Sequence, residues 1–219
     1  MSFKGGSREN KIYAGIAIFI IVVIVFAVFW FFCTNQLTAA YIENHILGDA
    51  WSEDLGERDG DSQFCALEKW ASYTYRNNDS SFPAYITVTS IKTLFMMSEE
   101  DLRDQTSNTI KQASEQGIVI DEGTMITGVR ALDNGHKTAY IIYDGNDTSN
   151  EPNERIKIIG ESWNCGTSGN SVICIGFAQV TNASEINMAH WAKIIKDKEG
   201  TFGLDLKGDD GLIFNVRCH

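Results

Sequence analysis

The segment that decides the fold is MITGVRALDNGHKTAYIIY, residues 125–143. Asn134 and Gly135 lie at its centre, and both tolerate the positive φ angles that a tight two-residue turn requires. β-branched and aromatic residues occupy the two flanks, as is typical of paired strands. The segment therefore predicts a hairpin. A two-residue turn would pair Val129 with Tyr140 on one face and Arg130 with Ala139 on the other.

Similar patterns of apolar and β-branched residues predict further strands. A second hairpin is expected at 155–163 and 172–180, and single strands are expected at 84–95 and 212–216. Strands that follow one another in the chain pair as hairpins, so the sheet is predicted to be mostly antiparallel.

About three helices are expected beside this sheet, at 62–76, 98–117 and 184–200. The middle one has the clearest start, because Ser98 is a suitable N-cap and Asp101 takes the capping-box position. Sheet and helices together predict the α+β class and a single folded domain.

A strongly apolar segment near the N-terminus stands apart from this domain. No charged residue occurs from Ile12 to Cys33, and a helix of about 22 residues rises about 33 Å, enough to cross a bilayer core of about 30 Å. We therefore expect an N-terminal transmembrane helix with the lipid bilayer as its partner. The 219-residue chain has a formal net charge of -11, which argues against nucleic acid as a partner.

Charges beside the apolar segment predict its orientation. Lys4, Arg8 and Lys11 precede it with Glu9 as the one acidic residue, and basic flanks stay in the cytoplasm. The chain is thus expected to be a single-pass protein of the cell membrane. Its expected parts are a short cytoplasmic N-terminus at 1–11, a transmembrane helix at 12–33, a stalk and acidic linker at 34–60, and an extracytoplasmic α+β domain at 61–219.

Three further hypotheses concern the same region. Leu37, Tyr41, Ile42 and Ile46 are spaced so that they would prolong the membrane helix as a stalk. A signal peptide cleaved after Thr38-Ala39-Ala40 is the alternative to an uncleaved anchor. Lys4-Gly5-Gly6 is similar to a prepilin processing site, which implies a pilin-like filament subunit, although a polar run at 7–11 replaces the apolar residues usual in that family.

Four cysteines lie beyond the apolar segment, and an extracytoplasmic location favours disulfides. Cys165 and Cys174 bracket the tip of the second hairpin and are expected to pair, which leaves Cys65 to pair with Cys218. The alternative is a metal site made from Cys165, Cys174, Cys218 and His219, although no C-x-x-C spacing supports it. No cofactor is expected.

Other candidate sites are weaker. The acidic loop after the first hairpin offers Asp144, Asn146 and Thr148 as calcium ligands, although such residues also dominate solvated turns. The N-glycosylation pattern occurs at Asn78, Asn146 and Asn182.

The sequence contains no G-x-S-x-G, S-x-x-K, H-E-x-x-H, Walker-loop or G-x-G-x-x-G motif. The favoured function is therefore a non-enzymatic binding or assembly subunit of an envelope or membrane complex, with another membrane or envelope protein as its partner. A membrane-tethered extracytoplasmic hydrolase is the alternative, with Asp121 and Glu122 as candidate catalytic carboxylates.

Overall fold

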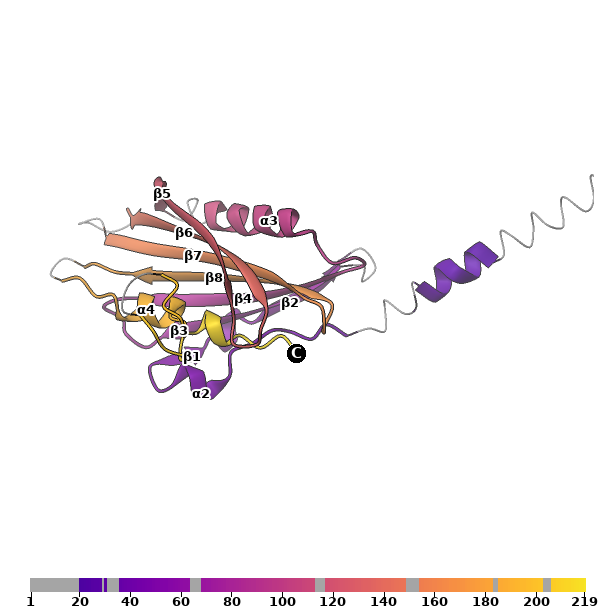
Figure 1. Ribbon diagram of the computed structural model, residues 1–219, viewed down its shortest axis with the longest axis horizontal. Coiled ribbons are helices and arrows are strands. Elements are labelled where there is room, and N and C mark those ends of the chain that lie inside the picture. Colours follow the sequence, from indigo (N-terminus) through magenta and orange to yellow (C-terminus); the bar gives the residue numbers. More distant parts are fainter. Residues whose placement is uncertain are drawn as a thin grey trace, which may run out of the picture.

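The computed structural model describes residues 20–28, 30, 36–63, 68–112, 117–148, 154–182, 185–202 and 206–219. Its centre is one antiparallel sheet in the order β1-β3-β4-β8-β7-β6-β5, with β2 also paired to β3 (Figure 1). The strands are β1 Trp51–Glu53, β2 Asp59–Gln63, β3 Glu68–Asn77, β4 Ala84–Thr93, β5 Ile118–Ala131, β6 Lys137–Asp147, β7 Glu154–Cys165 and β8 Asn170–Gln179. Helices pack on this sheet, so the predicted α+β class is confirmed.

The predicted central hairpin is β5–β6, but its register differs by one residue from the expected one. Arg130 pairs with Thr138 instead of Ala139, and Tyr140 pairs with Gly128 instead of Val129. The reason is a three-residue loop, 133–135, in which Gly135 takes a φ of 81° and donates its N–H to Leu132. Because paired residues point to the same face, this register determines which side chains of β5 and β6 lie together on each face of the sheet.

One face of the sheet is covered by α3, Glu99–Gln112. The predicted cap is confirmed, since Ser98 Oγ accepts a hydrogen bond from Asp101 N at 3.1 Å. The helix approaches β7 so closely that a Cβ on Gly160 would lie 2.5 Å from Thr106 Cγ2. Glycine at this position therefore allows the helix and the sheet to pack.

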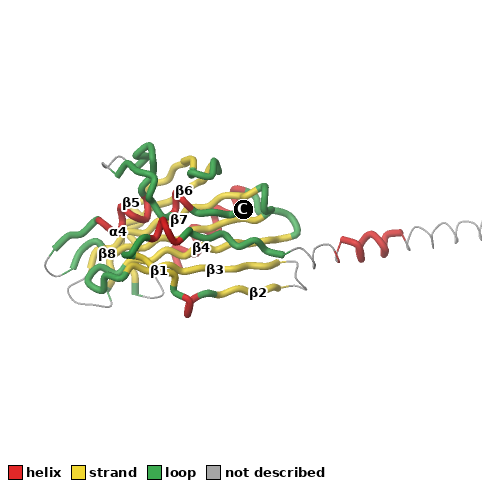
Figure 2. Tube along the Cα trace, turned by 90° about the horizontal axis from the view of Figure 1, so that it is seen from below, coloured by secondary structure: helices red, strands yellow, loops and turns green. Residues whose placement is uncertain are grey.

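The opposite face is covered by a layer of loops and short helices, which Figure 2 shows crossing the strands. The first part of this layer is the segment 36–50, which includes α2, Asn44–Leu47. The expected stalk is wrong here: Ala40 and Ile42 are buried in the main core and do not prolong a membrane helix. Burial of these apolar side chains places the start of the folded domain near residue 36 and not at 61.

The acidic linker expected up to residue 60 is also part of the fold. It forms β1, the 3₁₀ helix η1 at Leu55–Glu57, and the start of β2. Trp51 at the start of β1 lies in the main core, so this stretch is tied to the sheet edge.

The second part of the loop layer is C-terminal. It contains α4, Ala189–Ile195, and the 3₁₀ helix η3, Ile213–Asn215. The helix expected at 184–200 is therefore shorter than predicted, although Trp191 and Ile195 point inward as expected. The strand expected at 212–216 is wrong, because Leu212, Ile213 and Val216 are all buried and a single turn packs them against the core.

The helix expected at 62–76 is also wrong, since residues 68–77 form β3. Trp70, Tyr73 and Tyr75 favour strands, and β3 gains a partner on each side because β4 pairs with one edge and β1 and β2 with the other. Tertiary pairing outweighs the helical spacing of Ala71 and Tyr75.

The expected membrane span falls largely outside the described residues. Residues 20–28 are helical with exposed side chains, whereas 12–19, 29 and 31–33 are not described. Within the described part of the chain, no helix has both the length and the apolar character needed to span a bilayer. The transmembrane helix stays a prediction.

Candidate metal centre

The C-terminal segment lies against the tip of the β5–β6 hairpin. Asp133 N donates to Phe214 O at 3.1 Å, and Asn134 Nδ2 donates to Val216 O at 2.8 Å. Arg217 adds an ion pair to Asp133 at 3.1 Å. These contacts bring the last residues of the sequence next to the start of β6 and the end of β7.

Four potential metal ligands meet at this point: His136, Cys165, Cys218 and His219. One sulfur or nitrogen atom from each lies within 4.8 Å of the ligand atoms of the other three. If the β6–β7 register continues beyond its last pair, Ala139 with Ser162, then His136 stands directly opposite Cys165. The sheet therefore positions two ligands, and the C-terminal segment supplies the other two.

The spacing within the cluster matches a tetrahedral site. His219 Nδ1 lies 3.4 Å from Cys165 Sγ and 3.6 Å from Cys218 Sγ. In a zinc site with bonds of about 2.3 Å to sulfur and about 2.05 Å to nitrogen, a tetrahedral angle separates these atoms by about 3.6 Å. These two distances are therefore close to those that a central ion would impose.

Burial and unsatisfied polar atoms give a second, independent indication. Cys165 and Cys218 are fully buried. Nε2 of His136 is also buried and has no hydrogen-bond partner among the described residues. Buried polar atoms without partners are rare. Around a metal site, His136 would be a ligand, and Trp163 and Ser168 would donate hydrogen bonds to the thiolates.

The pKa shifts of His136 and Cys165 also suit metal ligation. Burial acts to raise the pKa of Cys165, but hydrogen bonds from Cys218 and Ser168 outweigh it and lower that pKa to about 7. Burial raises the pKa of Cys218 to about 12, and the neighbouring Cys165 adds to the rise. Burial, followed by the charge of His219, lowers the pKa of His136 and favours its neutral form. A cation would draw both thiols into the thiolate form.

The predicted disulfide between Cys165 and Cys174 is wrong. Cys165, Cys174 and Cys218 all carry free thiols. Cys165 pairs with Asn170 at the end of β7. Cys174 pairs with Glu161, which lies four residues before Cys165 in the same strand. Four residues of strand span about 13 Å, beyond the Cα separation of about 7 Å that a disulfide tolerates. The pair Cys65–Cys218 cannot be placed, because Cys65 lies outside the described residues.

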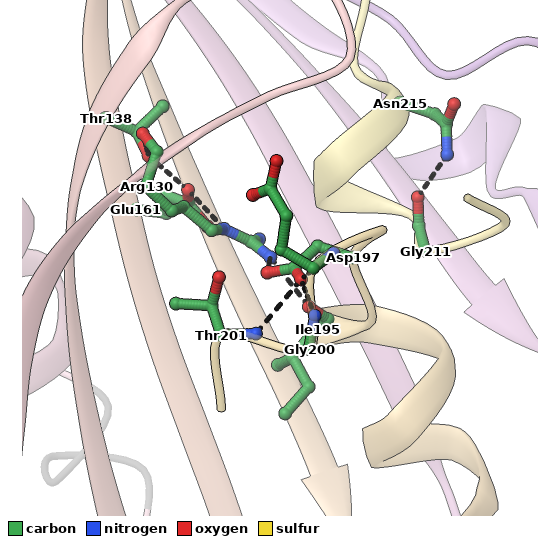
Figure 3. A network of polar contacts seen from close by, with 10 residues as sticks. Arg130, Thr138, Glu161, Ile195, Asp197, Gly200, Thr201, Gly211 and Asn215 are labelled. Atoms are coloured by element: carbon green, nitrogen blue, oxygen red, sulfur yellow. Dashed lines mark hydrogen bonds and ion pairs between the residues drawn. The ribbon is translucent and has the colours of Figure 1, made fainter. Parts of the chain in front are cut away.

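A buried ionic network joins β5, β6 and β7 to the segment after α4 (Figure 3). Arg130 donates to both carboxylate oxygens of Glu161, at 2.8 and 2.6 Å, and to Asp197 Oδ2 at 3.0 Å. Thr138 also donates to Glu161, and Ile195 O accepts from Arg130 at 2.7 Å. Burial alone would lower the pKa of Arg130, but Glu161 and Asp197 raise it. The network fixes the loop after α4 to the sheet.

The structure does not bring the calcium candidates together. Asp144 belongs to β6 and forms ion pairs with Lys157 and, at 3.9 Å, with Arg155. The hydroxyl of Thr148 donates to Gly117 O at 2.9 Å, and Asn146 is another residue of β6. The charge of Asp144 is therefore balanced by basic side chains. Among the described residues, the one cluster of possible metal ligands is the group that contains His136.

The other predicted sites are dispersed. Asn78 is exposed in the β3–β4 turn, Asn146 is half-buried in β6, and Asn182 is half-buried with its Oδ1 bonded to Glu185 N at 3.0 Å. Asp121 and Glu122 are exposed in β5, where the pairing with β6 is irregular. His190 forms an ion pair with Asp79 at 3.2 Å. None of these carboxylates or histidines joins another site.

Sequence reasoning included three of the four cluster residues in its metal alternative but chose Cys174 and missed His136. The missing signal is a long-range one, since His136 and Cys165 lie 29 residues apart in the sequence and meet only in the folded chain. Comparisons of the chain with protein-family models, with curated proteins and with solved structures give no match.

Proposed function

We propose that this chain is a membrane-tethered binding or assembly module whose folded domain is held together by a structural zinc ion. The observation that carries the zinc assignment is the convergence of four ligand atoms, from His136, Cys165, Cys218 and His219, within 4.8 Å. The tether and the extracytoplasmic location rest on the apolar segment 12–33 and its basic flank.

The donor set favours zinc over other common ions. Two thiolates and two imidazoles suit a tetrahedral zinc ion, whereas calcium and magnesium prefer oxygen ligands. Four protein ligands also fill the coordination sphere, which is typical of structural sites; catalytic zinc sites keep one position for water or substrate. The site geometry therefore favours a stabilising ion over a hydrolytic centre.

The position of the ligands indicates what the ion would do. His136 directly precedes β6 and Cys165 ends the neighbouring strand β7, while Cys218 and His219 lie in the C-terminal segment. An ion at the centre joins sequence-distant parts and stabilises the folded state, because the site does not exist in the unfolded chain. It would also protect two thiols from oxidation outside the cytoplasm.

Metal content tests this proposal directly. The full chain, purified in detergent with zinc present and then dialysed, should contain one zinc ion per chain by elemental analysis. His219→Ala should abolish zinc retention, and this side chain is exposed, so the variant is expected to fold. His190→Ala removes a histidine outside the cluster and should retain the metal. A wild-type protein without zinc, in which Cys165 and Cys218 form a disulfide by mass spectrometry, would contradict the proposal.

A further inference from the structure

The outer strand of the sheet, β5, carries an unusual share of the exposed apolar side chains. Ten large hydrophobic side chains are exposed among the described residues from 36 onward, and four of them, Val119, Met125, Ile126 and Val129, belong to this one strand. Single exposed apolar residues are common on protein surfaces, but several on one element are typical of an interaction site. β5 is therefore a candidate contact surface.

β5 is also the last strand of the sheet (Figure 1). Among the described strands it pairs with β6 alone, in a regular register from Ile126 to Ala131. The opposite edge consists of the short strands β1 and β2 and carries the ion pairs of Arg58 and Arg76, features that protect an edge from further strand pairing. Residues 123–131 of β5 contain no lysine or proline, and their one charged side chain, Arg130, is buried. This edge therefore lacks the usual protection.

The exposed apolar side chains of β5 point to both faces of the sheet. Val129 pairs with Ala139 on the face that α3 covers, whereas Ile126 pairs with Ile142, which is buried in the main core on the other face. Both Val129 and Ile126 are 56% exposed. A helix or a lipid layer covers one face of a sheet, but a strand added to the edge covers both and pairs the free backbone N–H and C=O groups. An extended segment is therefore the occupant that fits.

The charge of β5 and the point where the chain enters the domain indicate whose segment this is. The two charged side chains that β5 exposes, Asp121 and Glu122, are both acidic, and the chain has a net charge of -11. This charge favours a basic segment over a second copy. Antiparallel pairing of two β5 strands would also direct the two entry points, marked by Gln36 beside Lys92 at the end of β4, to opposite ends of the joined sheet. Two anchors in one bilayer require both entry points on the same side.

We propose that β5 is the docking site for an extended segment of another protein, which adds to the free edge as an antiparallel strand. The side chains of this segment opposite Ile126 and Val129 are apolar, and basic residues near its C-terminal end lie beside Asp121 and Glu122. Main-chain hydrogen bonds give such a contact its affinity, and alternating side chains give it specificity. The inference rests on the proposed function of a binding module and names the surface that meets the partner.

Synthetic peptides test the backbone contact directly. The probe is a fluorescent peptide of three Val-Tyr repeats followed by Gly-Lys-Lys, and anisotropy measures its binding to the full chain in detergent. Methylating the backbone nitrogens of the valines removes the donors along one edge of the peptide, and methylating those of the tyrosines removes the donors along the other. One methylated peptide should bind about as well as the parent, and the other should bind at least about tenfold more weakly. Equal binding of both would overturn strand addition.

Variants of the protein locate the site. Ile126→Lys with Val129→Lys places a charge on each face of the edge and should weaken binding of the parent peptide at least about tenfold. Leu55→Lys with Ile186→Lys changes side chains that are at least as exposed elsewhere and should leave binding unchanged. Equal binding by the two double variants would overturn the assignment to β5. Wild-type dimers that Ile126→Lys with Val129→Lys dissociates would place a second copy on this edge and overturn the proposal of a foreign segment.

Zinc content, measured on the same preparations, separates this inference from the proposed metal centre. Protein that binds the peptide without zinc would overturn the metal centre and support the docking site. Protein that holds zinc but does not bind the peptide would overturn the docking site alone.

Discussion

Replacing Arg130 by methionine should lower the free energy of unfolding by about 3–5 kcal/mol, the usual cost of removing one partner from a buried ion pair. Arg130 and Glu161 are both almost completely buried. Without the guanidinium, the Glu161 carboxylate would keep a hydrogen bond from Thr138 but would lose its counter-charge in a region that water does not reach. Urea unfolding followed by circular dichroism measures the change.

Two control variants separate the ionic effect from general damage. Arg130→Met combined with Glu161→Leu should be less destabilising than Arg130→Met alone, because it leaves one buried carboxylate without its counter-charge instead of two. The remaining one, Asp197, keeps hydrogen bonds from backbone N–H groups of residues 199–201. Arg58→Ala disrupts an exposed pair with Glu53 and should cost at most about 1 kcal/mol. Equal costs for Arg130→Met and Arg58→Ala would show that the buried network contributes no more than a surface pair.

Zinc should also have a large effect on stability. Ligand that binds only the folded state stabilises it by about 4 kcal/mol when its free concentration is a thousand times the Kd. Adding zinc to metal-free protein should therefore raise the unfolding midpoint, and a chelator should reverse the change. Hydrogen exchange should show the largest loss of protection on chelation at residues 212–219 and in the loop 133–135, because the ligands join these parts.

Two variants give this prediction its controls. His219→Ala should have the stability of the metal-free protein and should not respond to zinc. Cys174→Ala removes a buried thiol outside the cluster, so it should be less stable than the wild type but gain as much stability when zinc is added. The prediction is wrong if His219→Ala responds to zinc as the wild type does.

Much of the fold could be predicted because its signals are local. Asn134-Gly135 marks the central hairpin, Gly166 to Asn170 mark the second, and Ser98 marks the start of α3; each signal lies within a few residues of the structure that it specifies. Turn and capping chemistry depends on neighbours in the sequence, so it survives without knowledge of the tertiary structure.

The elements that were predicted wrongly depend on contacts between residues far apart in the sequence. Tyr75 fits both a helical stripe and a strand, and only pairing with β4 and burial of its ring against the segment 36–50 decide between them. Ile42 and Ile46 look like a stalk until the core that they pack against is known. The metal cluster joins residues 136, 165, 218 and 219, a spacing that matches no local ligand motif.

The measurement that tests the account most directly is zinc X-ray absorption on the purified full chain. We expect a first shell of two sulfur atoms at about 2.3 Å and two nitrogen atoms at about 2.0–2.1 Å, with imidazole scattering beyond it. His136→Ala should remove one nitrogen from that shell or release the metal altogether. A shell of oxygen and nitrogen without sulfur would place the ion elsewhere on the protein and contradict the assignment of Cys165 and Cys218 as ligands.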